Sequence, residues 1–169
     1  MSRLLIDGYN LLHTGSSSAL KSEKEVEELI ERLRRYKRRK SHTITVIFDG
    51  YERGMPIERK EQIKGIGVVY SRLGEKADQV IERLVKQCGG SCLVVTSDRA
   101  LSDSVETHGA VVIDSESFIE RLNSAEYFEL KGVLETNESE ETGIHTRKKG
   151  NPKRKTKKER ERIRKLNKL

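Results

Sequence analysis

The 169-residue chain has no tryptophan, only two cysteines and two prolines, and no long apolar run. Without about 18 consecutive apolar residues, it has no candidate for a membrane-spanning helix. Asp7 interrupts the first apolar run too early for that run to be the core of a signal peptide. These absences predict a cytoplasmic protein that has no membrane partner.

The two cysteines, Cys88 and Cys92, have three residues between them, and the four histidines do not complete a zinc quartet with them. In a reducing compartment, cysteines persist as small apolar thiols. We therefore expect two thiols in or near the core, rather than a disulfide or a metal site.

Charge divides the chain into two parts. Residues 147–169 contain 13 lysines and arginines against two glutamates, whereas the residues before them carry a net charge of −4. Hydrophobic residues make up only 34% of the chain, so part of it must remain outside a packed core. We expect a folded domain at 1–128, an acidic linker at 129–146 and a basic tail at 147–169.

Short apolar runs alternate with amphipathic patterns throughout the expected domain. We expect strands at 3–6, 44–48, 66–70, 92–96 and 110–114, and helices at 22–40, 77–88, about 100–105 and from 115 onward. Ser22 and Ser115 are expected to cap two of the helices, and polar loops are expected at 7–10 and around Pro56. This alternation predicts an α/β domain with a parallel sheet covered on both faces.

Acidic residues follow the ends of three of these strands, at Asp7, Asp49 and Asp98, and Asp78 lies in the first turn of a helix. Ligands of open α/β sheets bind beyond the carboxyl ends of the strands. Two carboxylates about 4 Å apart repel by roughly 4 kcal/mol at an effective dielectric of 20, so a cluster needs a cation or raised pKa values. Hard oxygen ligands favour Mg²⁺ or Mn²⁺, and such a site suits phosphodiester hydrolysis.

A purely structural interpretation competes with this one, because aspartates also end strands and cap helices. Asp98 precedes a helix and could serve only as its cap. Asn10 and Ser97 lie at the same edge, where they either orient a ligand or stabilise turns. Three acids at one edge are harder to explain as caps than any one of them alone.

Other phosphate-handling motifs are missing. The first strand is not followed by Gly-x-Gly-x-x-Gly, and the chain has no Gly-x-x-x-x-Gly-Lys-Ser/Thr, so no nucleotide cofactor is expected. A dehalogenase-type phosphatase needs a second aspartate two residues after the first, where this chain has Tyr9.

Six short motifs follow one another along the chain: Leu5–Leu12 with Asp-Gly-Tyr-Asn, Phe48–Gly50, Tyr70–Ser71, Ala77–Glu82, Val94–Arg99 and Arg147–Pro152. In type and order they resemble the YacP-like NYN domain family, which belongs to the wider PIN-like nucleases. The resemblance implies a PIN-like three-layer α/β/α fold around a central parallel sheet. It also implies a Mg²⁺-dependent endoribonuclease that acts on mRNA and associates with the ribosome.

Carried over residue by residue, the resemblance makes Asp7, Asp78 and Asp98 the core acids, with Asn10, Asp49 and Ser97 beside them. The expected catalytic residues are Asp7, Asn10, Asp78, Ser97 and Asp98, and the expected metal ligands are Asp7, Asp49, Asp78 and Asp98. Gln79 follows Asp78 at a position where many family members have a second acid. Glu82 and Asp103 are secondary candidates.

The basic tail suits a phosphate backbone, which lysines and arginines bind by releasing counterions. The candidate RNA-binding residues are Arg147, Lys148, Lys149, Lys153, Arg154, Lys155, Lys157 and Lys158. The tail has no aromatic residue for base stacking, and it could instead only keep the protein soluble. Two alternatives to the endoribonuclease remain: a non-catalytic RNA- or ribosome-binding adaptor, and a metal-dependent DNA nuclease or phosphatase.

Deleting residues 147–169 should weaken RNA or ribosome binding and flatten its salt dependence, because the tail carries the positive charge. Slow metal-dependent cleavage should persist at high enzyme concentration. Titrations of RNA at several salt concentrations test this, and an unchanged salt slope would contradict it.

Overall fold

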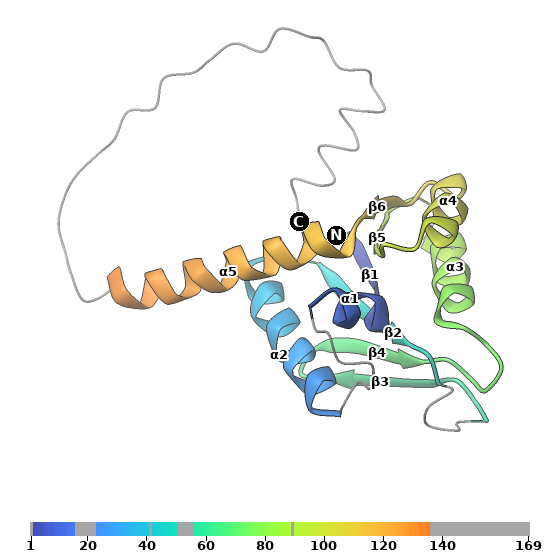
Figure 1. The fold of residues 1–169 in the computed structure, drawn as a ribbon, viewed down its shortest axis with the longest axis horizontal. Coiled ribbons are helices and arrows are strands. Elements are labelled where there is room, and N and C mark those ends of the chain that lie inside the picture. Colours follow the sequence, from blue (N-terminus) through green and yellow to red (C-terminus); the bar gives the residue numbers. More distant parts are fainter. Residues whose placement is uncertain (1, 16–22, 41, 51–55, 89, 136–169) are drawn as a thin grey trace, which may run out of the picture.

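The structure is a computed structural model, and it describes residues 2–15, 23–40, 42–50, 56–88 and 90–135 (Figure 1). Six strands and five helices are found in this part of the chain. In chain order they are β1 (Arg3–Asp7), α1 (Gly8–Gly15), α2 (Glu23–Arg39), β2 (Thr43–Phe48), β3 (Arg59–Ile63), β4 (Ile66–Tyr70), α3 (Ala77–Cys88), β5 (Cys92–Val95), α4 (Arg99–Thr107), β6 (Val111–Ile113) and α5 (Ser115–Glu135).

The strands form one sheet in the order β3-β4-β2-β1-β5-β6, and only β3 is antiparallel to its neighbour. After β1 the chain forms its neighbour β2, continues to the edge strand β3 and returns to place β4 between β3 and β2. It then crosses to the other side of β1 to add β5 and β6. The strand order therefore reverses between β1 and β5. In sheets of this type, a crevice for ligands forms at that point, beyond the carboxyl ends of the two strands.

Helices cover both faces of the sheet, as the alternation of apolar and amphipathic segments predicted (Figure 1). Alternate residues of β1 face opposite sides: Leu4 and Ile6 pack with α1, α2 and α5, whereas Leu5 packs with α3 and α4. Each of these three side chains is completely buried. The two resulting cores hold the central strands, and so fix the positions of the residues at the strand ends.

Three local expectations were wrong. A loop was expected at 7–10, but α1 begins at Gly8, directly after the strand. The polar region after Pro56 contains the edge strand β3, whose charged sequence Arg-Lys-Glu-Gln-Ile does not alternate cleanly between apolar and polar residues. Ser115 does not cap α5; instead the Asp114 carboxylate accepts a hydrogen bond of 2.8 Å from the backbone N–H of Ser117.

The α5 helix continues to Glu135, beyond the domain boundary expected at 128. The rest of the expected linker, the basic tail and the expected cap Ser22 lie outside the described residues. Within the described part of the chain, no helix is both long enough and apolar enough to cross a bilayer.

The expectation of two separate thiols is corrected, because Cys88 and Cys92 form a disulfide. Cys88 ends α3 and Cys92 begins β5, so the short turn between these elements brings the two Cα atoms to 5.9 Å. That separation lies in the range that a disulfide spans. The sequence spacing alone gave no sign that the turn would be this tight.

Gly50 packs tightly against the segment that leads into α3. Its backbone N–H donates to Ser71 Oγ at 2.9 Å, and Ser71 N–H donates to the carbonyl of Phe48 at 2.9 Å. A Cβ atom on Gly50 would lie 1.7 Å from the Ser71 carbonyl oxygen, a backbone atom and not the end of a flexible side chain. Only glycine fits at this position, immediately after Asp49.

Replacing Gly50 by alanine should destabilise the protein by about 1–3 kcal/mol, because the backbone must shift to make room. Gly67→Ala is the matched control, since its Cβ would meet the movable Thr45 hydroxyl at 3.1 Å. Both substitutions reduce the entropy of the unfolded chain equally. Urea unfolding of the two variants measures the difference, and equal stabilities would contradict the clash.

Candidate active site

The site begins at Asp7, the last residue of β1, at the point where the strand order reverses. Asp7 is only 8% exposed. Its Oδ1 accepts a hydrogen bond from Asn10 N–H at 3.2 Å, and its Oδ2 accepts a longer one from the Thr96 hydroxyl at 3.4 Å. Burial raises the pKa of Asp7 to about 6; the Asn10 hydrogen bond opposes this rise, and repulsion from Asp78 and Asp49 adds to it.

Asp49 follows β2, the strand next to β1, and it anchors the start of α3. Its Oδ1 accepts a hydrogen bond of 2.6 Å from the backbone N–H of Ala77, the first residue of that helix. A carboxylate at a helix N-terminus is stabilised by the unpaired N–H groups there. This contact brings the first turn of α3, and Asp78 with it, toward the sheet edge.

Asp78 is half-buried and lies within electrostatic range of the other acids. Burial raises its pKa above the ordinary value, and repulsion from Asp98 and Asp49 raises it further. Glu82, one turn later in α3, has a smaller effect in the same direction, while Lys76 acts in the opposite one. Asp78 therefore belongs to the same cluster as the three acids at the strand ends.

Asp98 is exposed and caps α4, as the competing interpretation proposed. Its side chain accepts a hydrogen bond from Leu101 N–H at 3.0 Å, through Oδ1. Its own backbone N–H donates to the Thr96 hydroxyl at 3.1 Å. The Thr96 hydroxyl also donates to Asp7. This one buried group therefore links the end of β1 to the turn that follows β5, and these two strands flank the crevice.

Asn10 and Ser97 are joined by a second network, centred on the side-chain oxygen of Asn10. That oxygen accepts hydrogen bonds from Ser97 N–H at 3.0 Å and from the Ser115 hydroxyl at 2.7 Å. Ser115 is completely buried, and its backbone N–H donates to Ser97 Oγ at 3.1 Å. With the oxygen of Asn10 fixed in this way, its amide nitrogen has no hydrogen-bond partner among the described residues and is available to a ligand.

The donor set suits a hard divalent cation that keeps part of its water shell. Among the described residues, no three acidic, histidine or cysteine side chains are close enough to hold an ion directly. Magnesium usually binds through one or two carboxylates and several waters. Burial raises the pKa of Asp7 and of Asp78, and repulsion between the acids adds to the rise, which fits a site for such a cation.

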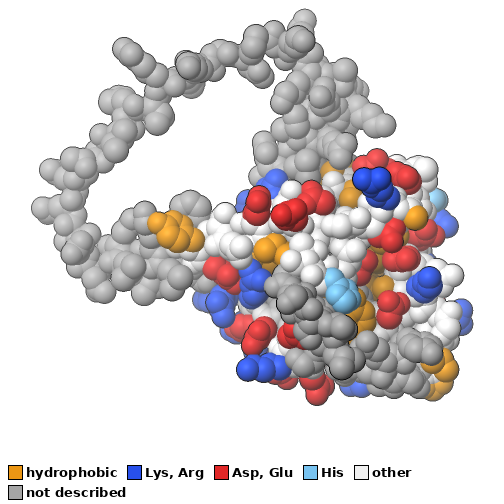
Figure 2. Space-filling view, in the orientation of Figure 1, with side chains coloured by type: hydrophobic (Ala, Val, Ile, Leu, Met, Phe, Trp, Pro, Cys, Tyr) orange, Lys and Arg blue, Asp and Glu red, His pale blue; other side chains and the backbone are white. Residues whose placement is uncertain are grey.

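The structure brings together all the site residues that were expected in the domain: Asp7, Asn10, Asp49, Asp78, Ser97 and Asp98. Of the secondary candidates, Glu82 accepts a hydrogen bond of 2.6 Å from the Ser104 hydroxyl, and Asp103 is exposed on α4. The eight expected RNA-binding residues of the tail lie outside the described residues. Several acidic side chains lie on the surface over α3 and α4 (Figure 2).

Thr96 and Ser115 have roles at the site that were not expected from the sequence. Thr96 was expected only as the last residue of a strand, but a hydroxyl two residues before Asp98 is well placed to accept from the backbone N–H of that residue. Ser115, the expected helix cap, instead holds the side-chain oxygen of Asn10. Its link to Asn10 spans 105 residues of sequence, and no local pattern predicts such a contact.

A mostly parallel sheet covered by helices on both faces, with aspartates at its carboxyl edge, is the architecture of a PIN-like three-layer α/β domain. The chain belongs to the YacP-like NYN domain family, whose model matches residues 4–168. This membership indicates a nuclease whose substrate is RNA. No curated protein is significantly similar in sequence to the chain.

Two crystal structures of Rae1 (YacP) from Bacillus subtilis resemble the fold. A point mutant of Rae1 has a TM-score of 0.68 and 20% sequence identity, with 83% of this chain and 86% of that chain covered. Another Rae1 structure has a TM-score of 0.66 and 22% identity, with coverages of 81% and 82%. At such low identity, these similarities support the fold.

Ionised Asp7 should destabilise the metal-free protein. Its pKa of about 6 in the folded state exceeds the ordinary value of 3.8, so the folded protein retains a proton that the unfolded chain has lost. The protonated Asp7 carboxyl therefore favours the folded state, and this contribution to the free energy of unfolding is fully present below about pH 4. As the pH rises through 6 the contribution is lost, and the free energy of unfolding falls by up to about 3 kcal/mol.

Asp7→Asn removes this titration, so the variant should be more stable than the wild type above pH 6, with the advantage disappearing toward pH 4. Urea unfolding at a series of pH values, with a chelator present, measures it. Glu120→Gln, at an exposed position of α5, is the control for removal of one negative charge. A stability difference that does not change with pH would contradict the prediction.

Proposed function

We propose that the protein is a Mg²⁺- or Mn²⁺-dependent endoribonuclease that hydrolyses phosphodiester bonds in mRNA at this acidic edge, in association with the ribosome. The cluster of Asp7, Asp49, Asp78 and Asp98 carries the proposal. These acids come from different elements, and their mutual repulsion contributes to the raised pKa values of Asp7 and Asp78. Such an arrangement costs stability unless a ligand compensates the charge.

The four aspartates would hold the cation, partly through water. A divalent cation supplies neutralisation of the scissile phosphate and activation of the attacking water. Without it, four carboxylates would repel the substrate, so the activity should require metal. The Thr96 hydroxyl keeps Asp7 in position relative to the turn that carries Asp98.

Asn10 and Ser97 provide neutral groups for the phosphate. The Asn10 oxygen is occupied by two hydrogen bonds, so its amide nitrogen is the group that can donate to a phosphate oxygen. Ser97 Oγ accepts from the backbone N–H of Ser115, which leaves its hydroxyl proton for the substrate. Neutral donors fixed in advance suit the negative charge that develops during hydrolysis.

The charge distribution supports a separate contribution of the basic tail. The expected domain at 1–128 carries no net charge and the expected linker at 129–146 a net charge of −4, so neither attracts a polyanion, whereas residues 147–169 carry a net charge of +11. A tail of this kind can hold the domain on ribosomal or messenger RNA without reading its sequence.

Asp78→Asn and Asp98→Asn should each reduce RNA cleavage by orders of magnitude, because each removes a negative ligand and retains the shape of the side chain. Asparagine caps helices about as well as aspartate, so Asp98→Asn should leave α4 and the melting temperature nearly unchanged. Cleavage of a labelled mRNA, free and bound to ribosomes, is measured with Mg²⁺, Mn²⁺ or a chelator.

Glu120→Gln is again the charge-matched control and should cleave normally. A DNA strand of the same sequence separates the endoribonuclease from a DNA nuclease. Wild-type protein that binds RNA but never cleaves it, with any metal, would refute the proposal and favour the adaptor. Normal cleavage by both aspartate variants would instead place the active site elsewhere.

A further inference from the structure

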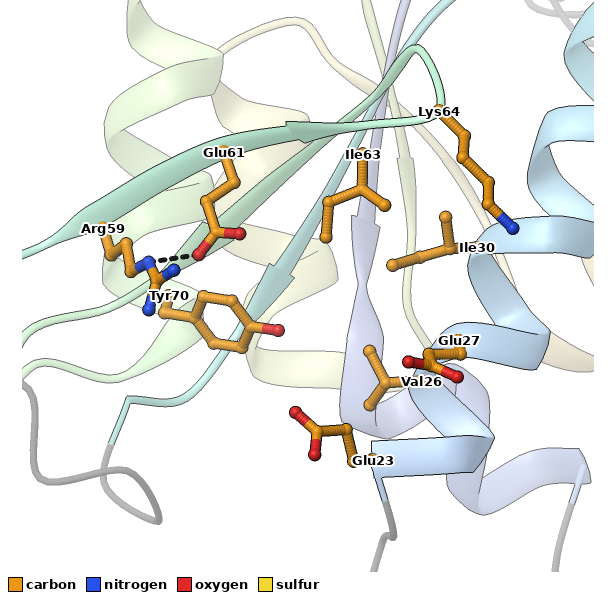
Figure 3. Close-up of a pocket in the computed structure, with 9 residues that line it drawn as sticks. All are labelled: Glu23, Val26, Glu27, Ile30, Arg59, Glu61, Ile63, Lys64 and Tyr70. Carbon is orange, nitrogen blue, oxygen red and sulfur yellow. Dashed lines mark ion pairs between the residues drawn. The ribbon is translucent and has the colours of Figure 1, made fainter.

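A cavity lies beside the acidic edge, between the N-terminal half of α2 and the strands β3 and β4 (Figure 3). Its volume of about 470 Å³ is within the range of small-molecule sites. Tyr70 lines the cavity and pairs in register with Phe48, the residue before Asp49. The cavity therefore extends to the sheet edge that carries the acid cluster.

Apolar side chains form much of the cavity wall and suit a flat ring. Val26 and Ile30 contribute from α2, and Ile63 contributes from β3. The ring of Tyr70 extends into the space between β3 and α2 (Figure 3). That ring stacks on Phe48 with a centroid distance of 5.6 Å and an interplanar angle of 23°, so its orientation is fixed.

The charged groups of the cavity lie on opposite sides. Glu23 and Glu27 project from α2, while Arg59 and Glu61 form an ion pair on β3 (Figure 3). The remaining cation, Lys64, pairs with Glu31 at 2.8 Å. The lining thus has three carboxylates against two cations, and this negative balance disfavours a phosphate. The cavity instead suits a neutral ligand with both donors and acceptors.

We propose that this cavity binds a guanine base of the RNA strand that is cleaved at the acidic edge; the inference rests on the proposed endoribonuclease function. Guanine offers its O6 and N7 acceptors to the Arg59 guanidinium and its N1–H and amino donors to the Glu27 carboxylate. Its flat faces fit between the apolar side chains. Single-stranded RNA is commonly read in this way, by bases turned out of the stack.

The first test uses the full-length protein and oligouridine strands that contain one guanosine at different positions. Cleavage is expected at a fixed spacing from the guanosine. Replacing guanosine by inosine, which lacks the amino group, should slow cleavage about tenfold. Cuts that ignore the position of the guanosine would overturn the proposal.

Glu27→Ala should remove the preference for guanosine over inosine. Glu28→Ala is the matched control, because Glu28 is the next residue of the same helix, is also exposed, and lines a different groove together with Ile119 and Leu122 of α5. The control should retain the preference. An equal loss in both variants would contradict a specific role for Glu27.

A binding measurement separates this proposal from the proposed function. Guanosine, without any phosphate, should shift the methyl NMR signals of Val26, Ile30 and Ile63 more than inosine does. If RNA is never cleaved but these shifts occur, the cavity binds guanine and the nuclease proposal fails. If RNA is cleaved and guanosine shifts none of these signals, the guanine site is refuted.

Discussion

Hydrogen bonds from helix N-termini to aspartates at the strand ends are the interactions on which the rest of the structure depends. Asp7 accepts from α1, Asp49 from α3, Asp98 from α4 and Asp114 from α5. Each bond satisfies a backbone N–H that the helix leaves unpaired, and also stabilises a negative charge. Three of these four aspartates belong to the acid cluster, so the same side chains start the helices and form the candidate site. The structural and catalytic interpretations of the aspartates are therefore compatible.

The sequence predicted the parallel part of the sheet well, because strands such as Cys92–Val95 are buried on both faces and consist of continuous apolar residues. It also placed the acids correctly, since an aspartate after such a run must lie at the carboxyl edge. Periodicity failed where an element is short or exposed. The α1 helix has eight residues and begins without any loop after Asp7, and β3 is an edge strand whose side chains are mostly charged.

Long-range contacts were the other part that the sequence could not supply. The bond between Ser115 and Asn10 joins the start of α5 to α1, and depends on how both helices cross the end of the sheet. The disulfide between Cys88 and Cys92 depends on the sharpness of one turn. The cavity lined by Tyr70 and Glu27 arises only when α2 packs over β4. Residue types and local spacing contain none of this geometry.

The two edge strands have a consequence for self-association. A sheet edge with unpaired N–H and C=O groups invites strands from other molecules, and charged or very short edge strands discourage this. At one edge, β3 begins with Arg59, Lys60 and Glu61, and at the other, β6 spans only three residues. Neither edge offers a long apolar template for a further strand. The domain can thus place a row of buried apolar strands at its centre with little risk of edge-to-edge aggregation.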